Sequence, residues 1–76
     1  MEFDKEVDAR GLSCPLPVLR LKKALFDLSG GQVVRVLATD PASVKDFKAF
    51  VHQTGHEMLY QEVMPDGAFE FFIKHK

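Results

Sequence analysis

The chain has 76 residues, a net charge of −1 at pH 7 and one cysteine, Cys14. A chain this short buries only about 60% of its unfolded surface, so we expect a single domain spanning residues 1–76. The near-neutral charge does not supply the positive field that nonspecific nucleic-acid binding requires, so no direct nucleic-acid partner is expected. One cysteine excludes an internal disulfide and a CxxC redox pair, which favours a thiol in a reducing compartment.

No apolar run approaches the roughly 18 residues of a membrane span, and residues 1–6 are too acidic for a secretion signal. We therefore expect a cytoplasmic monomer with no membrane partner.

Residues 3–9 alternate, with Phe3, Val7 and Ala9 on one side and three acids on the other, which predicts a half-exposed strand. Lys5 is the one residue that does not fit this alternation.

The next predicted element is a helix that starts at Pro15, because proline is tolerated in a first helical turn. Pro17 lies in the same turn, and Gly30 and Gly31 end the element. Its apolar stripe recurs at helical spacing and consists of Val18, Leu21, Ala24, Leu25 and Leu28.

Residues 32–38 are rich in β-branched side chains and predict a buried second strand. Asp40 and Pro41 then repeat the signal for a helix start, and this second helix runs to about Thr54, where Gly55 ends it.

Residues 57–63 and 68–74 predict two strands joined by a hairpin turn at residues 64–67. The last strand is rich in aromatic residues that suit a core, and Phe72 alternates away from its neighbours toward the open face of the sheet.

The order βαβαββ predicts an α/β (α+β) two-layer sandwich, because right-handed crossovers place both helices on one face of a four-stranded mixed sheet. In such units the helices start at the carboxyl ends of the parallel strands, where open α/β sheets usually place their sites. Cys14 and Asp40 should therefore lie at the same edge of the sheet.

If Pro15 is the first helical residue, Cys14 is the N-cap, with its sulfur at the positive end of the helix dipole. This position favours a thiolate or a persulfide anion, with a lowered pKa. Because Pro15 and Pro17 lack amide hydrogens, mainly the amides of Leu16 and Val18 remain to approach the sulfur, and the stabilisation should be moderate. The prolines also stiffen the loop that presents Cys14.

A lone intracellular cysteine is often a small buried hydrophobe. The place of Cys14 between the turn signals Gly11 and Pro15, at a helix start and near basic residues, favours a reactive thiol instead.

Two charged residues are candidates for the surroundings of Cys14. Asp40 is a common residue type for a helix N-cap, and beside Cys14 its carboxylate would oppose an anion or accept a hydrogen bond from the protonated thiol. Arg10 is either an anion partner or an ordinary surface residue.

Arg20, Lys22 and Lys23 form either a docking patch for an acidic partner or a solvated helix face. His52 and His56 do not predict a metal site, because Gly55 ends the helix between them and no thiol or acidic ligand lies beside them.

Residues 8–19, DARGLSCPLPVL, together with Lys22–Leu25 and Ala38–Pro41, resemble the TusA (SirA-like) sulfur-carrier family, whose CPxP motif falls here at residues 14–17. The resemblance implies a carrier that takes sulfur as a persulfide on Cys14 and requires no cofactor. It also implies a cysteine desulfurase or rhodanese as donor, a sulfur-relay protein as acceptor, and the fold of the C-terminal domain of translation initiation factor three.

Members of this family serve tRNA thiolation, molybdenum-cofactor supply or sulfur oxidation, and one branch is linked to selenium metabolism. The sequence does not choose among these pathways. Two other function classes remain open. One is a regulatory or interaction module in which Cys14 is incidental, and the other is a thiol redox enzyme, for which the sequence shows no resolving thiol.

Overall fold

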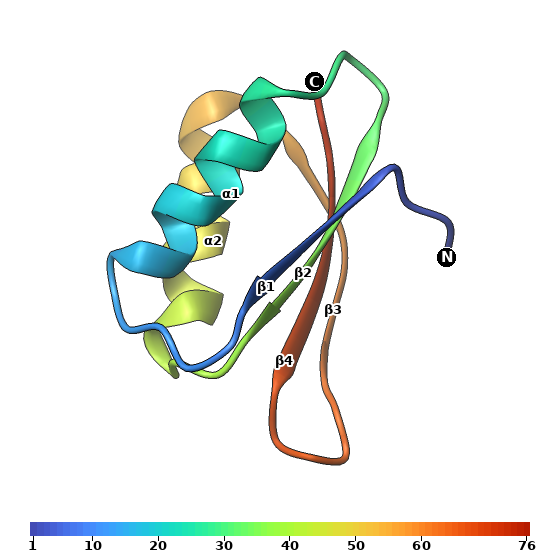
Figure 1. Ribbon diagram of the computed structural model, residues 1–76. Coiled ribbons are helices and arrows are strands. Elements are labelled where there is room, and N and C mark those ends of the chain that lie inside the picture. Colours follow the sequence, from blue (N-terminus) through green and yellow to red (C-terminus); the bar gives the residue numbers. More distant parts are fainter.

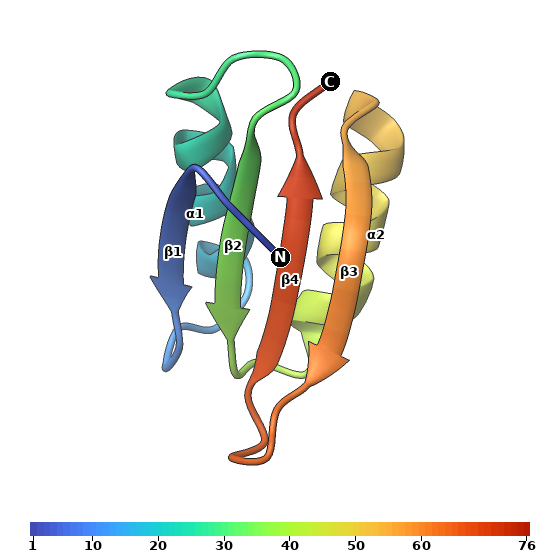
Figure 2. The same cartoon turned by 90° about the vertical axis from the view of Figure 1, so that its right-hand side faces the viewer.

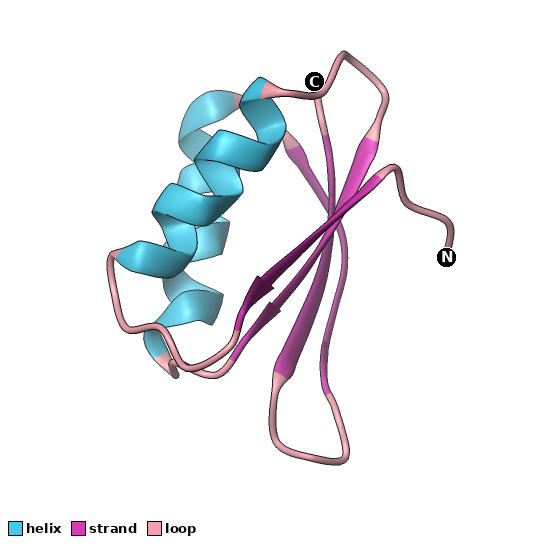
Figure 3. Ribbon diagram, in the orientation of Figure 1, coloured by secondary structure: helices cyan, strands magenta, loops and turns pink.

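The computed structural model describes all 76 residues and contains the six elements in the predicted order. They are β1 (Lys5–Ala9), α1 (Leu16–Phe26), β2 (Val33–Ala38), α2 (Ala42–Thr54), β3 (Glu57–Val63) and β4 (Phe69–Lys74). The sheet order is β1-β2-β4-β3, with β1 parallel to β2 and the other pairs antiparallel. Both helices cover one face of the sheet (Figures 1 and 3), so the two-layer sandwich is confirmed.

The first strand differs from its sequence prediction in where it begins and in the direction of Phe3. The strand starts at Lys5, and the residues before it cross the open face of the sheet (Figure 2). The Phe3 ring therefore lies 6.1 Å from the Phe72 ring, whereas Val7 packs against the core on the other face. The expectation that Phe3 and Val7 share one face is wrong. Lys5, which did not fit the alternation, pairs its ammonium with Asp27, the C-cap residue of α1, at 2.9 Å.

The hydrophobic core fills the space between the helices and the sheet. Phe47 of α2 and Phe71 of β4 are both fully buried, with their rings edge to face at 4.6 Å. Removing a buried phenylalanine side chain costs about 3–5 kcal/mol, so this pair alone is a large part of the stability of a small domain. The remaining buried members of the cluster are Ala9, Leu21, Ala24, Leu25, Val34, Val36, Ala38, Val51 and Ile73.

The opposite face of the sheet is polar at its centre and aromatic beside it. Arg35 forms ion pairs with Glu6 at 2.8 Å and with Glu70 at 2.6 Å. Phe72 lies on this face, as predicted, with the Tyr60 ring 5.7 Å away. Neither helix combines the length and apolar character needed to cross a membrane.

Candidate functional site

Two turns lie at one edge of the sheet, where the parallel strands end and the helices begin (Figure 1). The first turn, residues 10–15, connects β1 to α1 and contains Cys14. The second turn, residues 39–41, connects β2 to α2 and contains Asp40. Topology alone therefore brings together two segments that are far apart in the sequence.

Side chains of the second turn bond the backbone of the first. The Thr39 hydroxyl accepts a hydrogen bond from the Gly11 amide at 2.9 Å, and Asp40 Oδ2 accepts one from the Cys14 amide at 2.6 Å. Asp40 Oδ1 also accepts the Ala42 amide at 3.0 Å, at the start of α2. The expectation that Cys14 and Asp40 lie together is confirmed, and Asp40 joins both helix starts.

The start of α1 differs from its prediction by one residue. The N-cap position is Pro15, whose φ of −97° and ψ of 14° are not helical, and the first helical residue is Leu16. The Cys14–Pro15 peptide bond is cis. Because the helix begins at Leu16, Cys14 precedes the N-cap instead of occupying it. The Leu16 amide donates to the Ser13 carbonyl at 2.9 Å instead of remaining free for the sulfur. Pro17 lies buried in the first turn, as expected.

Cys14 is exposed at one end of a shallow hollow between the two helices. Val18 and Lys22 of α1 line one side, and Asp46 and Phe50 of α2 line the other. The Lys22 ammonium lies 5.8 Å from the centre of the Phe50 ring. The hollow that contains Cys14 therefore combines apolar side chains with one positive and one negative side chain.

The pKa of Cys14 is raised above its ordinary value, and its predicted lowering is wrong. The largest cause is hydrogen bonding to the Asp46 carboxylate, followed by desolvation and by the charges of Asp46 and Asp40. These carboxylates favour the protonated thiol over the thiolate. The Leu16 amide does not offset them, because it donates to the Ser13 carbonyl.

Asp40 acts on Cys14 through its charge and through the backbone. Its charge contributes, less than that of Asp46, to the raised pKa of Cys14, in the direction expected for a carboxylate that opposes an anion. Both of its oxygens bond backbone amides, so it does not hold the thiol directly. The Ala42 amide first, and the Cys14 amide second, lower the pKa of Asp40, which keeps this carboxylate charged.

Comparison with known proteins identifies the family of the chain. The family model described as "Sulfurtransferase TusA" matches residues 5–75. The chain belongs to the TusA family. It is 56% identical over 73 residues to a sulfur carrier protein TusA of Allochromatium vinosum, an alignment that covers 96% of this chain and 95% of that one. It is 49% identical over 70 residues to a putative sulfur carrier protein of Neisseria meningitidis, covering 92% and 93% of the two chains.

A solved structure agrees with this membership. A SirA-like protein from Desulfitobacterium hafniense superposes with a TM-score of 0.84 and 32% identity, covering 93% of this chain and 96% of that chain. Because the alignments of the TusA family extend over nearly the whole chain, its resemblance to this family is not limited to the CPxP motif.

Arg10 does not contact the TusA-family cysteine. Its guanidinium donates to both carboxylate oxygens of Asp8, at 2.9 Å each, on an exposed surface. This pairing lowers the pKa of Asp8 to about 2. Of the two alternatives for Arg10, the geometry favours an ordinary surface residue.

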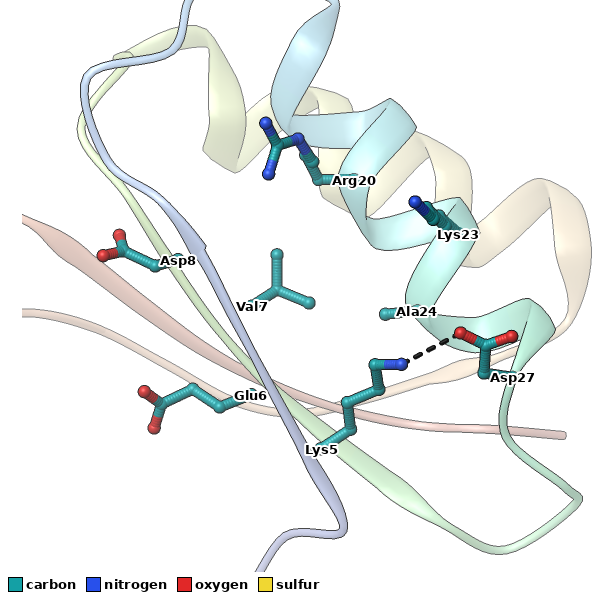
Figure 4. A pocket seen from close by; sticks show the side chains of 8 residues that line it. All are labelled: Lys5, Glu6, Val7, Asp8, Arg20, Lys23, Ala24 and Asp27. Carbon is teal, nitrogen blue, oxygen red and sulfur yellow. Dashed lines mark hydrogen bonds and ion pairs between the residues drawn. The ribbon is translucent and has the colours of Figure 1, made fainter.

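The three basic residues of α1 lie on two flanks of the helix. Lys22 lines the hollow that contains Cys14. Arg20 and Lys23 line a different hollow, between α1 and β1, where the Lys5–Asp27 ion pair also lies (Figure 4). The structure thus separates side chains that the sequence placed in one patch.

The sequence analysis did not identify Asp46 as a neighbour of Cys14. It also did not predict that the Leu16 and Leu19 side chains are exposed. Asp46 lies four residues before Phe50, a spacing that puts both on one flank of the second helix. That signal identifies a flank and does not reveal that Cys14 lies across from it. No group of three or more His, Cys, Asp or Glu side chains is arranged to hold a metal ion.

Proposed function

We propose that this TusA-family protein accepts sulfane sulfur as a persulfide on Cys14 and passes it to an acceptor protein. A cysteine desulfurase or a rhodanese is the donor that fits the family, and the reduced thiol suits a cytoplasmic site of action. The observation that carries the proposal is that the chain's single cysteine is exposed at a helix start in the CPxP motif. The recipient pathway stays open among tRNA thiolation, molybdenum-cofactor supply and sulfur oxidation.

Both transfer steps are thiol–persulfide exchanges that leave the number of electrons unchanged. In loading, Cys14 loses its proton to solvent and its thiolate attacks the outer sulfur of the donor's persulfide. The donor's sulfur–sulfur bond breaks, and its electron pair stays on the donor's cysteine. In release, an acceptor thiolate attacks the outer sulfur on Cys14, and Cys14 leaves as the thiolate. One sulfur atom moves in each step.

The surroundings of Cys14 support presentation of the sulfur more than chemical activation. Asp40 fixes the Cys14 amide, and we propose that Pro15 and Pro17 restrict the loop beside it. Arg10 is assigned no contact with the sulfur, because its guanidinium is paired with Asp8.

The partner must approach over the exposed start of α1. Leu16 and Leu19 are 45% and 50% exposed and offer apolar contact. We propose that Lys22 contributes most to docking, because it lines the hollow that contains Cys14, and that Arg20 and Lys23 contribute less.

Intact-mass spectrometry tests the proposal after incubation with a cysteine desulfurase and cysteine. We expect the mass of one added sulfur atom, removed by dithiothreitol and absent in Cys14→Ser. If Cys14→Ser still gains the adduct, or if several desulfurases and rhodaneses give none with the wild type, the carrier proposal is wrong. A Cys14→Ser protein that keeps its full biological effect would favour the interaction module instead.

A further inference from the structure

Asp46 is a partly buried carboxylate that faces the reactive thiol without a cation of its own. It lines the same hollow as Cys14, and it is the largest cause of the raised pKa of the thiol. It takes part in none of the ion pairs of the molecule. Lys22 lines the same hollow, but its ammonium lies over the Phe50 ring instead of pairing with Asp46.

This arrangement affects both transfer steps in the same direction. Cys14 is the attacking thiolate during loading and the leaving thiolate during release. A negative charge beside it disfavours that thiolate each time. A thiol whose conjugate thiolate is disfavoured also leaves more slowly, so an undocked persulfide is protected from attack by small thiols.

We propose that Asp46 is a positioning residue that retains sulfur on Cys14 until a partner places a lysine or arginine against the Asp46 carboxylate. The inference rests on the proposed function, because it concerns the stability of the same persulfide. Charge complementarity indicates the partner's chemistry. The hollow presents an unpaired carboxylate on the α2 side and an ammonium on the α1 side, so a docking surface with a cation opposite Asp46 and an acid opposite Lys22 would fit both.

The other charged groups nearby are Asp40 of the second turn, whose charge acts on Cys14, and Lys22 of α1, which lines the same hollow. Both remain in an Asp46→Asn variant, so this substitution isolates the effect of one charge. Glu57→Gln is the matched control, because it removes one exposed carboxylate at the start of β3, at the end of the molecule away from the first turn (Figure 1).

The first experiment measures alkylation of Cys14 by iodoacetamide, a small neutral reagent, as a function of pH. We expect Asp46→Asn to shift the rate profile to lower pH. For each unit that the pKa falls, the thiolate fraction below the pKa rises tenfold and its nucleophilicity falls by about threefold, so the neutral-pH rate rises by about threefold. Asp46→Ala should shift in the same direction, and Asp46→Glu and Glu57→Gln should stay near wild type. Unchanged profiles in both neutral variants would overturn the proposal.

The second experiment loads the protein with inorganic polysulfide and compares two acceptors, dithiothreitol and a sulfur-free rhodanese. Asp46→Asn should lose sulfur to dithiothreitol faster than wild type, because a thiol of lower pKa is the better leaving group. It should gain no such advantage with the rhodanese, whose docked surface supplies the cation to the wild type. Equal acceleration with both acceptors would contradict relief by a partner. If the wild type takes up no sulfur on Cys14, the proposed function fails, whereas the alkylation profiles still decide the role of Asp46.

Discussion

The two turns at the carboxyl edge of the sheet begin alike and have different roles. Each ends with a proline at the N-cap position of the following helix, Pro15 before α1 and Pro41 before α2. The first turn exposes the Cys14 side chain, whereas the second uses its side chains to accept amides from the first. Cys14 is therefore held by its backbone, whereas its side chain stays exposed.

Among substitutions in the two turns, Asp40→Ala should have the largest effect on stability and on sulfur loading. The change removes the acceptor for both the Cys14 and the Ala42 amides, so two backbone groups lose their partner at once. We expect the melting temperature to fall by about 5 °C and sulfur loading to slow. Asp40→Asn keeps one oxygen acceptor and should lie between Asp40→Ala and wild type. Unchanged melting and loading in Asp40→Ala would show that the second turn does not hold the first.

The stability difference between wild type and Asp40→Ala should depend on pH. Hydrogen bonds from Ala42 and Cys14 lower the pKa of Asp40 from its ordinary value of 3.8, so the folded state favours the carboxylate. The stabilisation is therefore complete above that ordinary value and is lost as the pH falls through the lowered pKa. Thermal unfolding should show a full difference between wild type and Asp40→Ala at pH 7 and a shrinking difference below about pH 4. A gap that widened in acid would contradict the assigned hydrogen bonds.

A smaller effect is expected from Thr39→Val, which keeps the side-chain shape and removes the hydroxyl that accepts the Gly11 amide. An exposed hydrogen bond of this type contributes about 0.5–1 kcal/mol to the free energy of unfolding. Denaturant unfolding should show this loss, and loading should slow less than in Asp40→Ala. Thr39→Ser retains the hydroxyl and is the control. Greater damage from Thr39→Val than from Asp40→Ala would reverse the ranking of the two contacts.

The smallest effect concerns docking, because exposed charges act mainly on association rate. Lys22→Glu should slow transfer from a desulfurase by about two- to fivefold at low salt, without changing stability. Lys23→Glu is a matched charge reversal on the other flank of α1 and should have less effect. The difference should shrink as salt rises, since the Debye length is only about 8 Å at physiological ionic strength. Equal transfer rates for the two variants would indicate that docking does not depend on which flank of α1 carries the positive charge.

Most of the fold could be predicted from the sequence because its signals are local. Pro17 marks a helix start, Gly55 with its φ of 85° ends α2, and the apolar spacing gives the buried face of each helix. Topology rules then place Cys14 near Asp40, as the structure confirms. The face of the sheet on which Phe3 lies could not be predicted. Phe3 precedes β1, which begins at Lys5, so the alternation of side chains along the strand does not apply to it.

The electrostatics of the site could not be predicted in the same way. A one-residue difference in the start of α1 removes Cys14 from the N-cap, and this changes which groups surround the sulfur. Asp46 comes beside Cys14 only through the packing of two helices, a long-range contact without a local sequence signal. The sign of the pKa shift therefore depends on tertiary structure.

The carrier claim is tested most directly by following one labelled sulfur atom through Cys14. The protein is loaded with radioactive sulfur from labelled cysteine and a desulfurase, separated from the donor, and mixed with a sulfur-free rhodanese as acceptor. We expect the label to leave Cys14 and to appear on the acceptor in equal amount, and Cys14→Ser to carry no label at any stage. Label that stays on the loaded protein, or that reaches the acceptor equally well through Cys14→Ser, would contradict the assignment of this protein as a persulfide carrier.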